Sequence, residues 1–122
     1  MGMSDPGQEP GFHLGYSEDW LPRLGRAMAV RAPRLLDVGL HGGWAGLYEV
    51  TPDHNALIGR SSSTTNVLYA TGLSGHGFLQ APAVGEVVRD LYLGRTPCVD
   101  VGPLTADRFA DGRAGRPESH IV

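Results

Sequence analysis

Residues 66–93 read NVLYATGLSGHGFLQAPAVGEVVRDLYL, and they contain the clearest succession of structural signals in the chain. Residues 66–71 are a near-continuous run of β-prone residues, the pattern of a strand that is buried on both faces. A glycine-rich turn follows at Gly72–Gly77. Over Leu79–Leu93 the apolar residues recur at helical spacing, and Gly94 is a natural C-terminal cap. The stretch therefore predicts a strand, a turn and a helix in direct succession.

The glycine turn has the chemistry of a ligand site. Gly72, Gly75 and Gly77 remove side chains where the chain bends, so a ligand can approach the backbone closely. The N–H groups at the start of the following helix have no intrahelical partners, and they favour an acceptor or a partial negative charge. A flavin ring suits such a site, because charge builds up at one edge of the ring on reduction. A purely structural turn explains these local features equally well.

Other kinds of site fit the turn poorly. The order Gly72-x-x-Gly75-x-Gly77 is not the G-x-G-x-x-G of a dinucleotide phosphate loop, which we therefore reject. Ser74 lacks the G-x-S-x-G frame of a hydrolase nucleophile. His76 either satisfies a local hydrogen bond or takes part in proton transfer or a flavin contact. No histidines or cysteines have the close spacing of metal ligands, so we expect no metal site.

The chain before this stretch predicts further elements. Ala56–Gly59 reads as a short strand, after a turn at residues 51–55. Leu36–Tyr48 reads as an extended segment with a glycine-rich centre. An amphipathic helix begins with Ser17 as its capping hydroxyl and ends before Pro33. These signals predict a small α+β fold with two main helices and several strands.

Composition bounds the organisation and excludes several classes of function. With 122 residues and 41% hydrophobic content, the chain should fold as one small domain, which we expect at 16–110 between a flexible leader, 1–15, and a disordered tail, 111–122. A formal net charge of −3 argues against a nucleic-acid or polybasic membrane partner. No apolar run approaches the roughly 20 residues of a membrane span. One cysteine, Cys98, and the absence of a secretion signal predict a cytoplasmic protein.

Two sequence blocks point to a known family. The first is GWAGLYEVTPDHNALIG at residues 43–59, and the second is LYATGLSGHGF at residues 68–78, followed by APAVG at 81–85. Together they resemble the FAD-dependent amine and amino-acid oxidoreductases of the D-amino-acid oxidase superfamily, which includes sarcosine oxidase, glycine oxidase and the β subunit of dye-linked proline dehydrogenase. The resemblance covers roughly Trp20 to Phe109.

The resemblance implies both a fold and a set of roles. It implies the C-terminal part of a two-domain FAD oxidoreductase fold, with residues 66–71 in the FAD domain and the following helix pointing its N-terminus at the flavin. It implies that Tyr48 lies toward the substrate and that His76 and Tyr48 are the candidate catalytic residues. It places the flavin contacts in the glycine turn, at Gly72, Leu73, Ser74, Gly75, His76, Gly77 and Phe78. The implied function is oxidation of a small amine or amino acid of the sarcosine, glycine or proline kind.

The departures from the family pattern leave two hypotheses. The N-terminal β-α-β unit that binds the ADP half of FAD is not in this sequence, so a second, FAD-binding chain could complete the site. Gly46 stands where some relatives carry a flavin-linking cysteine, and Leu79 stands where they carry a lysine thought to activate oxygen, which favours a dehydrogenase over an oxidase. The alternative is a non-catalytic truncated domain that self-associates, for example as a dimer, and does not hold FAD alone.

Overall fold

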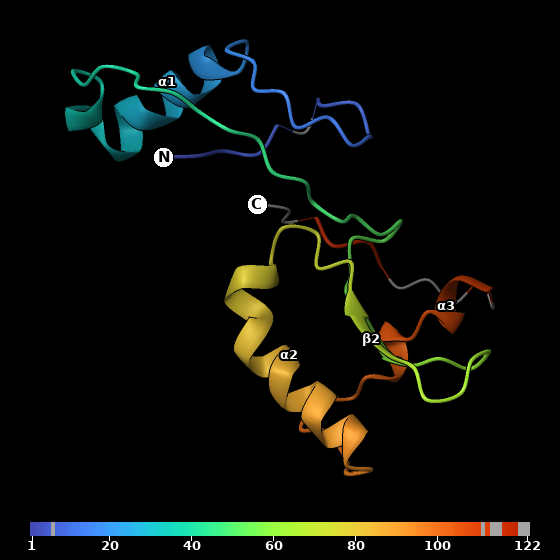
Figure 1. Cartoon of the computed structure of the whole chain (residues 1–122). Coiled ribbons are helices and arrows are strands. Elements are labelled where there is room, and N and C mark those ends of the chain that lie inside the picture. The colour runs from blue at the N-terminus through green and yellow to red at the C-terminus, as the bar shows by residue number, and fades with distance from the viewer. Residues whose placement is uncertain (6, 111, 113–115, 120–122) are drawn as a thin grey trace. The chain divides into compact units, whose positions relative to one another are not determined.

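The computed structural model describes residues 1–5, 7–110, 112 and 116–119. The chain divides into two compact units, residues 1–47 and residues 48–122 (Figure 1). Each unit is described on its own below.

Unit 1 is built around helix α1, Leu21–Arg31, which is followed by the 3-10 turn η1, Pro33–Leu35. The predicted end of the helix is confirmed, because Ala32 is the C-cap and Pro33 cannot continue the helix. No residue of α1 is buried. The helix therefore depends on local hydrogen bonds and not on a core within the described residues.

The predicted start of α1 is wrong by several residues. Ser17 does not cap the helix; its Oγ accepts a hydrogen bond from the Asp19 N–H (3.1 Å) and donates one to Asp19 Oδ2 (2.7 Å). The Ser17 hydroxyl is therefore already hydrogen-bonded within a turn that precedes the helix, and it does not cap the helix. Trp20 is the N-cap and makes no side-chain capping bond.

The extended segment expected at Leu36–Tyr48 does not become a strand. Residues 36–56 contain no helix or strand in the structure. Glycines at positions 39, 42, 43 and 46 offer no side chain to pack, which weakens strand formation. Without a paired neighbour, an isolated strand leaves its backbone groups to water.

Unit 2 contains an antiparallel hairpin of β1, Leu57–Arg60, and β2, Leu68–Thr71. The register pairs Leu57 with Thr71 and Gly59 with Tyr69. A Cβ on Gly59 would lie 2.9 Å from the Tyr69 hydroxyl oxygen, so the small residue makes room for the ring across the strands. Both predicted strands are present, with shorter or shifted bounds.

The expectation that residues 66–71 are buried on both faces is wrong for this chain. Along β2 the first two residues are half-buried and the last two are exposed. The hairpin is a two-stranded sheet, and within the described residues β2 pairs only with β1. The strand β2 therefore carries more apolar side chains than the rest of this chain buries.

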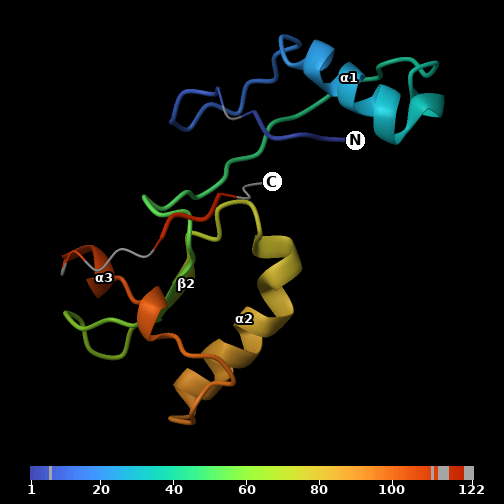
Figure 2. The same ribbon diagram turned by 180° about the vertical axis from the view of Figure 1, so that it is seen from behind.

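Helix α2, Gly77–Tyr92, packs against both strands, as the views in Figures 1 and 2 show from opposite sides. It begins two residues before the predicted start, so Pro82 lies in its second turn and not in its first. Because proline has no N–H, the Phe78 carbonyl loses its helical partner there. Gly94 ends the helix as predicted, with φ of 68° and bonds from Gly94 N to Leu91 O (3.2 Å) and Arg95 N to Asp90 O (2.8 Å).

The core of unit 2 is small. Among the described residues, only Ile58 of β1 and Val87 of α2 are both hydrophobic and buried. The 3-10 turn η2, Gly102–Leu104, contacts β1, and the short helix α3, Asp107–Ala110, follows it along the chain. This is the small mixed helix-and-strand fold that the sequence predicts.

The described residues of the predicted leader and tail contain no helix or strand. Residues 1–15 contain no helix or strand where they are described. Positions 111, 113–115 and 120–122 of the expected tail lie outside the described residues. Within the tail, Glu118 N donates to Asp53 O (3.0 Å) and Arg116 O accepts from Asn55 Nδ2 (3.3 Å), so this part of the tail contacts the turn before β1.

Candidate functional site

The glycine turn between β2 and α2 has an unusual backbone. Gly72, Ser74 and Gly75 have φ of 65°, 49° and 91°, in the region that L side chains rarely adopt. Ser74 is fully buried, and its Oγ donates to Gly72 O (3.2 Å). Because a non-glycine residue in this conformation is costly, the surrounding contacts must hold the turn in place.

The turn separates two groups of predicted site residues. Leu73 and His76 are half-buried and face a pocket inside unit 2. Phe78 and Leu79, in the first turn of α2, are 94% and 78% exposed. Tyr48 is 51% exposed and does not line that pocket. The structure therefore places Leu73 and His76 at the pocket and leaves Phe78, Leu79 and Tyr48 outside it.

Packing within the chain explains two of the glycines without any ligand. A Cβ on Gly72 would lie only 2.4 Å from Cγ2 of Thr51, and a Cβ on Gly77 would lie 3.2 Å from Cδ1 of Leu73. Ser74 N also donates to Glu49 O (3.2 Å), so the turn rests against residues 49–51. The predicted flavin contacts of these glycines remain a prediction.

A buried ion pair joins the turn at residues 51–55 to the C-terminal part of unit 2. Arg108 Nε lies 2.8 Å from Asp53 Oδ2, and Arg108 Nη2 lies 2.9 Å from Asp53 Oδ1. The two side chains are only 2% and 4% exposed. The Arg108 guanidinium also donates to three backbone carbonyl oxygens, those of Asn55, Leu104 and Thr105. All five of its N–H groups are thus satisfied.

The pair determines the protonation of its carboxyl group. Hydrogen bonding from Arg108 holds the pKa of Asp53 well below its usual range, and this outweighs the opposing effect of burial. The Asn55 N–H and the Thr51 hydroxyl also donate to Asp53 Oδ1, at 3.2 Å each. Arg108 could not be predicted from the sequence, because its partner is 55 positions away and no local pattern connects them.

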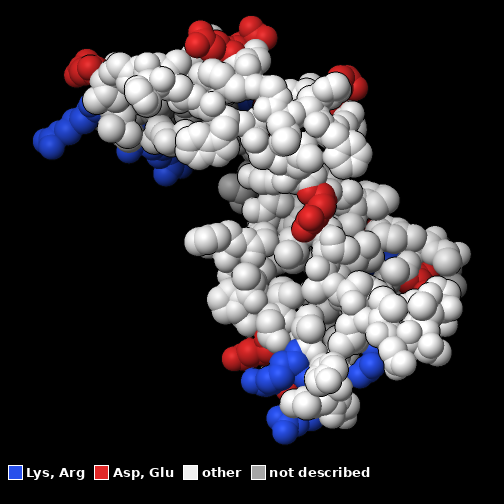
Figure 3. Space-filling view, viewed as in Figure 1, with Lys and Arg blue, Asp and Glu red and all other residues white. Residues whose placement is uncertain are grey.

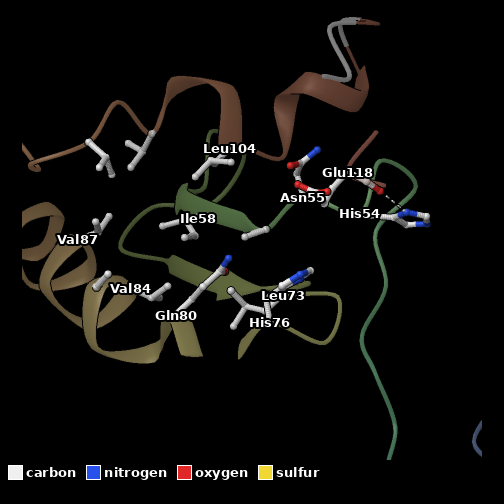
Figure 4. Close-up of a pocket in the computed structure, with 14 residues that line it drawn as sticks. His54, Asn55, Ile58, Leu73, His76, Gln80, Val84, Val87, Leu104 and Glu118 are labelled. Carbon is white, nitrogen blue, oxygen red and sulfur yellow. Dashed lines mark hydrogen bonds between the residues drawn. The ribbon is translucent and has the colours of Figure 1, made fainter. Parts of the chain in front are cut away.

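A pocket of about 420 Å³ lies between the hairpin, α2 and the segment around η2 (Figure 4). Its walls are mostly aliphatic, from Ile58, Ala83, Val84, Val87, Val99, Val101 and Leu104. Polar side chains line the rest, among them His54, Asn55, His76 and Gln80. His54 Nδ1 donates to the Glu118 carbonyl oxygen (3.1 Å), the contact drawn as a dashed line in Figure 4. Glu118 therefore contributes to the lining of the pocket beside His54.

The first half of α2 presents an uncharged surface. Residues 77–85 include no acidic or basic side chain. Figure 3 shows white surface over the N-terminal end of α2, while charged residues gather toward its other end. Because Gly77 and Phe78 lie in the first turn of α2, their N–H groups have no intrahelical acceptor. Here exposed apolar side chains adjoin backbone donors.

The described residues offer neither a metal cluster nor a membrane helix. No group of three or more histidine, cysteine, aspartate or glutamate side chains in this part of the chain could hold a metal ion. None of the helices described is both long and apolar enough to cross a bilayer.

The sequence of the chain places it in a family of flavin-dependent oxidoreductases. The sequence model of the FAD-dependent oxidoreductase family matches residues 2–91. The chain belongs to this family, as its two sequence blocks predict.

Individual relatives place the chain within longer proteins. It is 36% identical over 120 residues to FAD-dependent oxidoreductase domain-containing protein 1 of Bos taurus, a match that covers 97% of this chain and 24% of the relative. It is 44% identical over 71 residues to N-methyl-L-tryptophan oxidase of Salmonella newport (strain SL254), covering 58% of this chain and 19% of the relative. The chain thus spans about a quarter or less of the curated relatives it matches.

A solved structure supports the same assignment. The crystal structure of L-proline dehydrogenase from P. horikoshii superposes with a TM-score of 0.75 at 36% sequence identity. The match covers 84% of this chain and 28% of that one. The small mixed fold is therefore a fragment of the dehydrogenase fold.

The residues present fit only part of the cofactor that the family name implies. The uncharged start of α2, with its free N–H groups, suits the ring of a flavin, which carries partial negative charge on one edge. The nucleotide half of FAD requires a phosphate-binding loop, and the sequence contains no G-x-G-x-x-G. The chain can offer a contact surface for the flavin ring, but it contains no loop that would bind the diphosphate of FAD.

Proposed function

We propose that this chain supplies the flavin-ring side of an FAD-dependent oxidoreductase that oxidises an amine or amino acid, and that further polypeptide completes the site. The observation that carries the proposal is the strained glycine turn leading into an uncharged, exposed helix start, in a chain of this family. Bound FAD would accept a hydride from the carbon attached to the substrate nitrogen, which would leave the substrate as an imine.

The residues of the turn would orient and stabilise the ring. The N–H groups of Gly77 and Phe78 would donate toward the edge of the ring that becomes negative. Phe78 and Leu79 would exclude water from that edge by their apolar surface. His76 and Tyr48 remain the candidate catalytic residues, His76 to hold a proton and Tyr48 to contact substrate.

The substrate class follows from the relatives. N-methyl-L-tryptophan and L-proline, the compounds after which these two relatives are named, are both amino acids whose nitrogen carries two carbon substituents. We infer that the completed enzyme acts on a small amino acid or amine of this kind. Leu79, at the position of the family's lysine, favours a dehydrogenase that passes electrons to another acceptor.

The need for further polypeptide follows from the small core and the open surfaces. With only two buried hydrophobic residues among those described, unit 2 has little apolar burial of its own. Phe78, Leu79 and Tyr92 are at least 74% exposed on α2. An N-terminal FAD-binding chain is the partner we favour, because it would supply both a cover for this helix and the missing phosphate loop.

An NMR titration tests the assignment of the ring side. Amide spectra of the chain would be recorded with millimolar lumiflavin, which has only the ring, and with ADP, which has only the nucleotide half. We expect lumiflavin to shift the amides of residues 72–79, while ADP leaves the spectrum unchanged. Shifts confined to other residues, or none at all, would contradict the proposal. Stoichiometric yellow flavin in the purified chain would contradict the need for further polypeptide.

A second candidate is a non-catalytic domain that self-associates. The exposed apolar side chains of α2 favour it, because such a surface tends to associate with a second copy. Light scattering of the purified chain with Phe78→Ser and Leu79→Ser as matched variants tests it. A dimer that both variants convert to a monomer, without any lumiflavin response in the parent, would favour this candidate over the flavin site.

A further inference from the structure

We propose that Thr51, together with the buried pair Asp53–Arg108, positions the glycine turn at residues 72–77. The inference deepens the proposed function, on which its last step rests, by naming residues that act on the flavin-facing turn without touching the flavin. Arg108 lies outside the residues that the family model matches, 2–91.

The first step is the rigidity of the ion pair. Arg108 binds both oxygens of Asp53 and donates its remaining N–H groups to three backbone carbonyl oxygens. A planar guanidinium with every donor satisfied in a buried place has few alternative arrangements. The position of Asp53 relative to the end of unit 2 is thereby set.

The second step leads from Asp53 to Thr51. The Thr51 hydroxyl lies 2.8 Å from Asn55 O and 3.2 Å from Asp53 Oδ1. Asn55 O also accepts a hydrogen bond from Arg108. Thr51, Asp53, Asn55 and Arg108 therefore belong to one hydrogen-bonded network. Thr51 is 6% exposed, and these bonds set its rotamer. Its methyl group is consequently held in one direction.

The third step is the contact of that methyl group with the turn. Cγ2 of Thr51 occupies the space beside Gly72, where a Cβ would lie 2.4 Å away. Two residues further along, Ser74 is held at a φ of 49° with its N–H bonded to Glu49 O. The Glu49 carbonyl oxygen and the Thr51 methyl group therefore both contact the turn, from one side. The strained conformation persists because these neighbours over-determine it.

The last step concerns the helix. The turn ends where α2 begins, and His76 O accepts from both Leu79 N (3.1 Å) and Gln80 N (3.0 Å). A shift of the turn would redirect the free N–H groups of the first helical turn. The network thus sets the direction in which these donors face a ring.

Two substitutions at one position separate positioning from simple stabilisation. Thr51→Ser keeps the hydroxyl bonds and removes the methyl group beside Gly72, while Thr51→Val keeps a methyl group and removes the hydroxyl. Hydrogen exchange would be followed at Ser74 N and His76 N in the turn, and at Arg95 N beyond the far end of α2 as an internal control.

We expect Thr51→Ser to raise exchange of Ser74 and His76 by about tenfold while Arg95 stays unchanged, because only the turn is loosened. Equal changes at both ends of the helix, or no change at the turn, would overturn the proposal. Thr51→Val should also raise exchange of Ser74 and His76, because the hydroxyl bonds that hold the methyl group in place are lost. No effect from either variant would overturn the role of Thr51.

The experiment also separates this inference from the proposed function. Exchange is measured without flavin, so its result holds whether or not a flavin binds. Repeating the lumiflavin titration on Thr51→Ser then tests the last step, with smaller or displaced shifts at residues 77–79 expected. If lumiflavin causes no shifts in the parent chain but Thr51→Ser still raises exchange in the turn, the proposed function is contradicted. The positioning role of the network is then still supported.

Discussion

The two units of the chain hold their charged and polar groups in opposite ways. In unit 1 the ion pair of Arg23 with Asp5 (3.2 Å) has side chains that are 46% and 44% exposed. The Tyr16 hydroxyl there is buried without a hydrogen-bond partner among the described residues. In unit 2 the pair of Arg108 with Asp53 is almost wholly buried, and every guanidinium donor is used.

This difference indicates that the long-range tertiary contacts of the chain are concentrated in unit 2. A solvated pair can break and reform at little cost, while a buried pair must stay intact once it is covered. Unit 1 is therefore a local structure with one helix, and unit 2 is a cooperative one that joins a hairpin, a turn and a helix. The predictions below test whether the two units behave so differently.

The largest effect should come from removing one partner of the buried pair. Arg108→Ala leaves the Asp53 carboxylate buried without its cation, which costs about 3–5 kcal/mol in the unfolding free energy of unit 2. The matched variant Arg23→Ala in unit 1 should cost about 0–1 kcal/mol. Urea denaturation followed by circular dichroism measures both. Similar losses for the two variants would contradict the contrast between the units.

The next effect concerns the strained turn. Gly72→Ala introduces a Cβ that clashes with Thr51 and places alanine at a φ of 65°, which together should cost about 2–4 kcal/mol. Adding Thr51→Ser removes the clashing methyl group and should recover part of that loss. Thermal denaturation of the single and double variants gives the coupling. Strict additivity would show that Thr51 and Gly72 do not press on one another.

The stability of unit 2 should fall in acid. The folded-state pKa of Asp53 is lowered, so the unfolded chain binds more protons and stability rises with pH. The contribution is present above the ordinary pKa of aspartate and is lost from about pH 4 downward. The loss should be smaller than that from Arg108→Ala, because protonation leaves other bonds of Arg108 intact. Asp53→Asn should abolish this part of the pH dependence in urea titrations at a series of pH values.

The smallest effects distinguish the helices. Added Cβ atoms on Gly25 of α1 or Gly85 of α2 meet no atom within 4 Å, so alanine is tolerated at either position. Each substitution should favour its helix by up to about 1 kcal/mol. Gly85→Ala should raise the unfolding midpoint of unit 2, while Gly25→Ala should raise helix content without moving that midpoint. A midpoint shift from Gly25→Ala would show that α1 unfolds together with unit 2.

Local chemistry predicted the elements of unit 2 well. The β-prone run, the glycine turn and the cap at Gly94 are each encoded within a few residues, and all three are confirmed. The extended segment expected at Leu36–Tyr48 does not form a strand, because strand formation depends on a neighbour that no local pattern reveals. The start of α1 was misplaced, because Ser17 used its hydroxyl in a turn that looks like a helix cap in sequence.

The candidate site was predictable only in part. The glycine turn stands out in the sequence, but the reason for Gly72 lies in Thr51, and the reason for Gly77 lies in Leu73. Arg108 was not predictable, since nothing near it in the chain indicates a partner 55 positions earlier. Long-range pairs of this kind require the fold before they can be recognised.

The bond between Asp53 and Arg108 also affects where the boundary of a transferable module should be drawn. The family match ends at residue 91, yet the acidic side chain at position 53 depends on a base at position 108. A graft of the matched region alone would carry a buried carboxylate into its host without its counter-ion. A transplantable piece of this chain must therefore contain both Asp53 and Arg108.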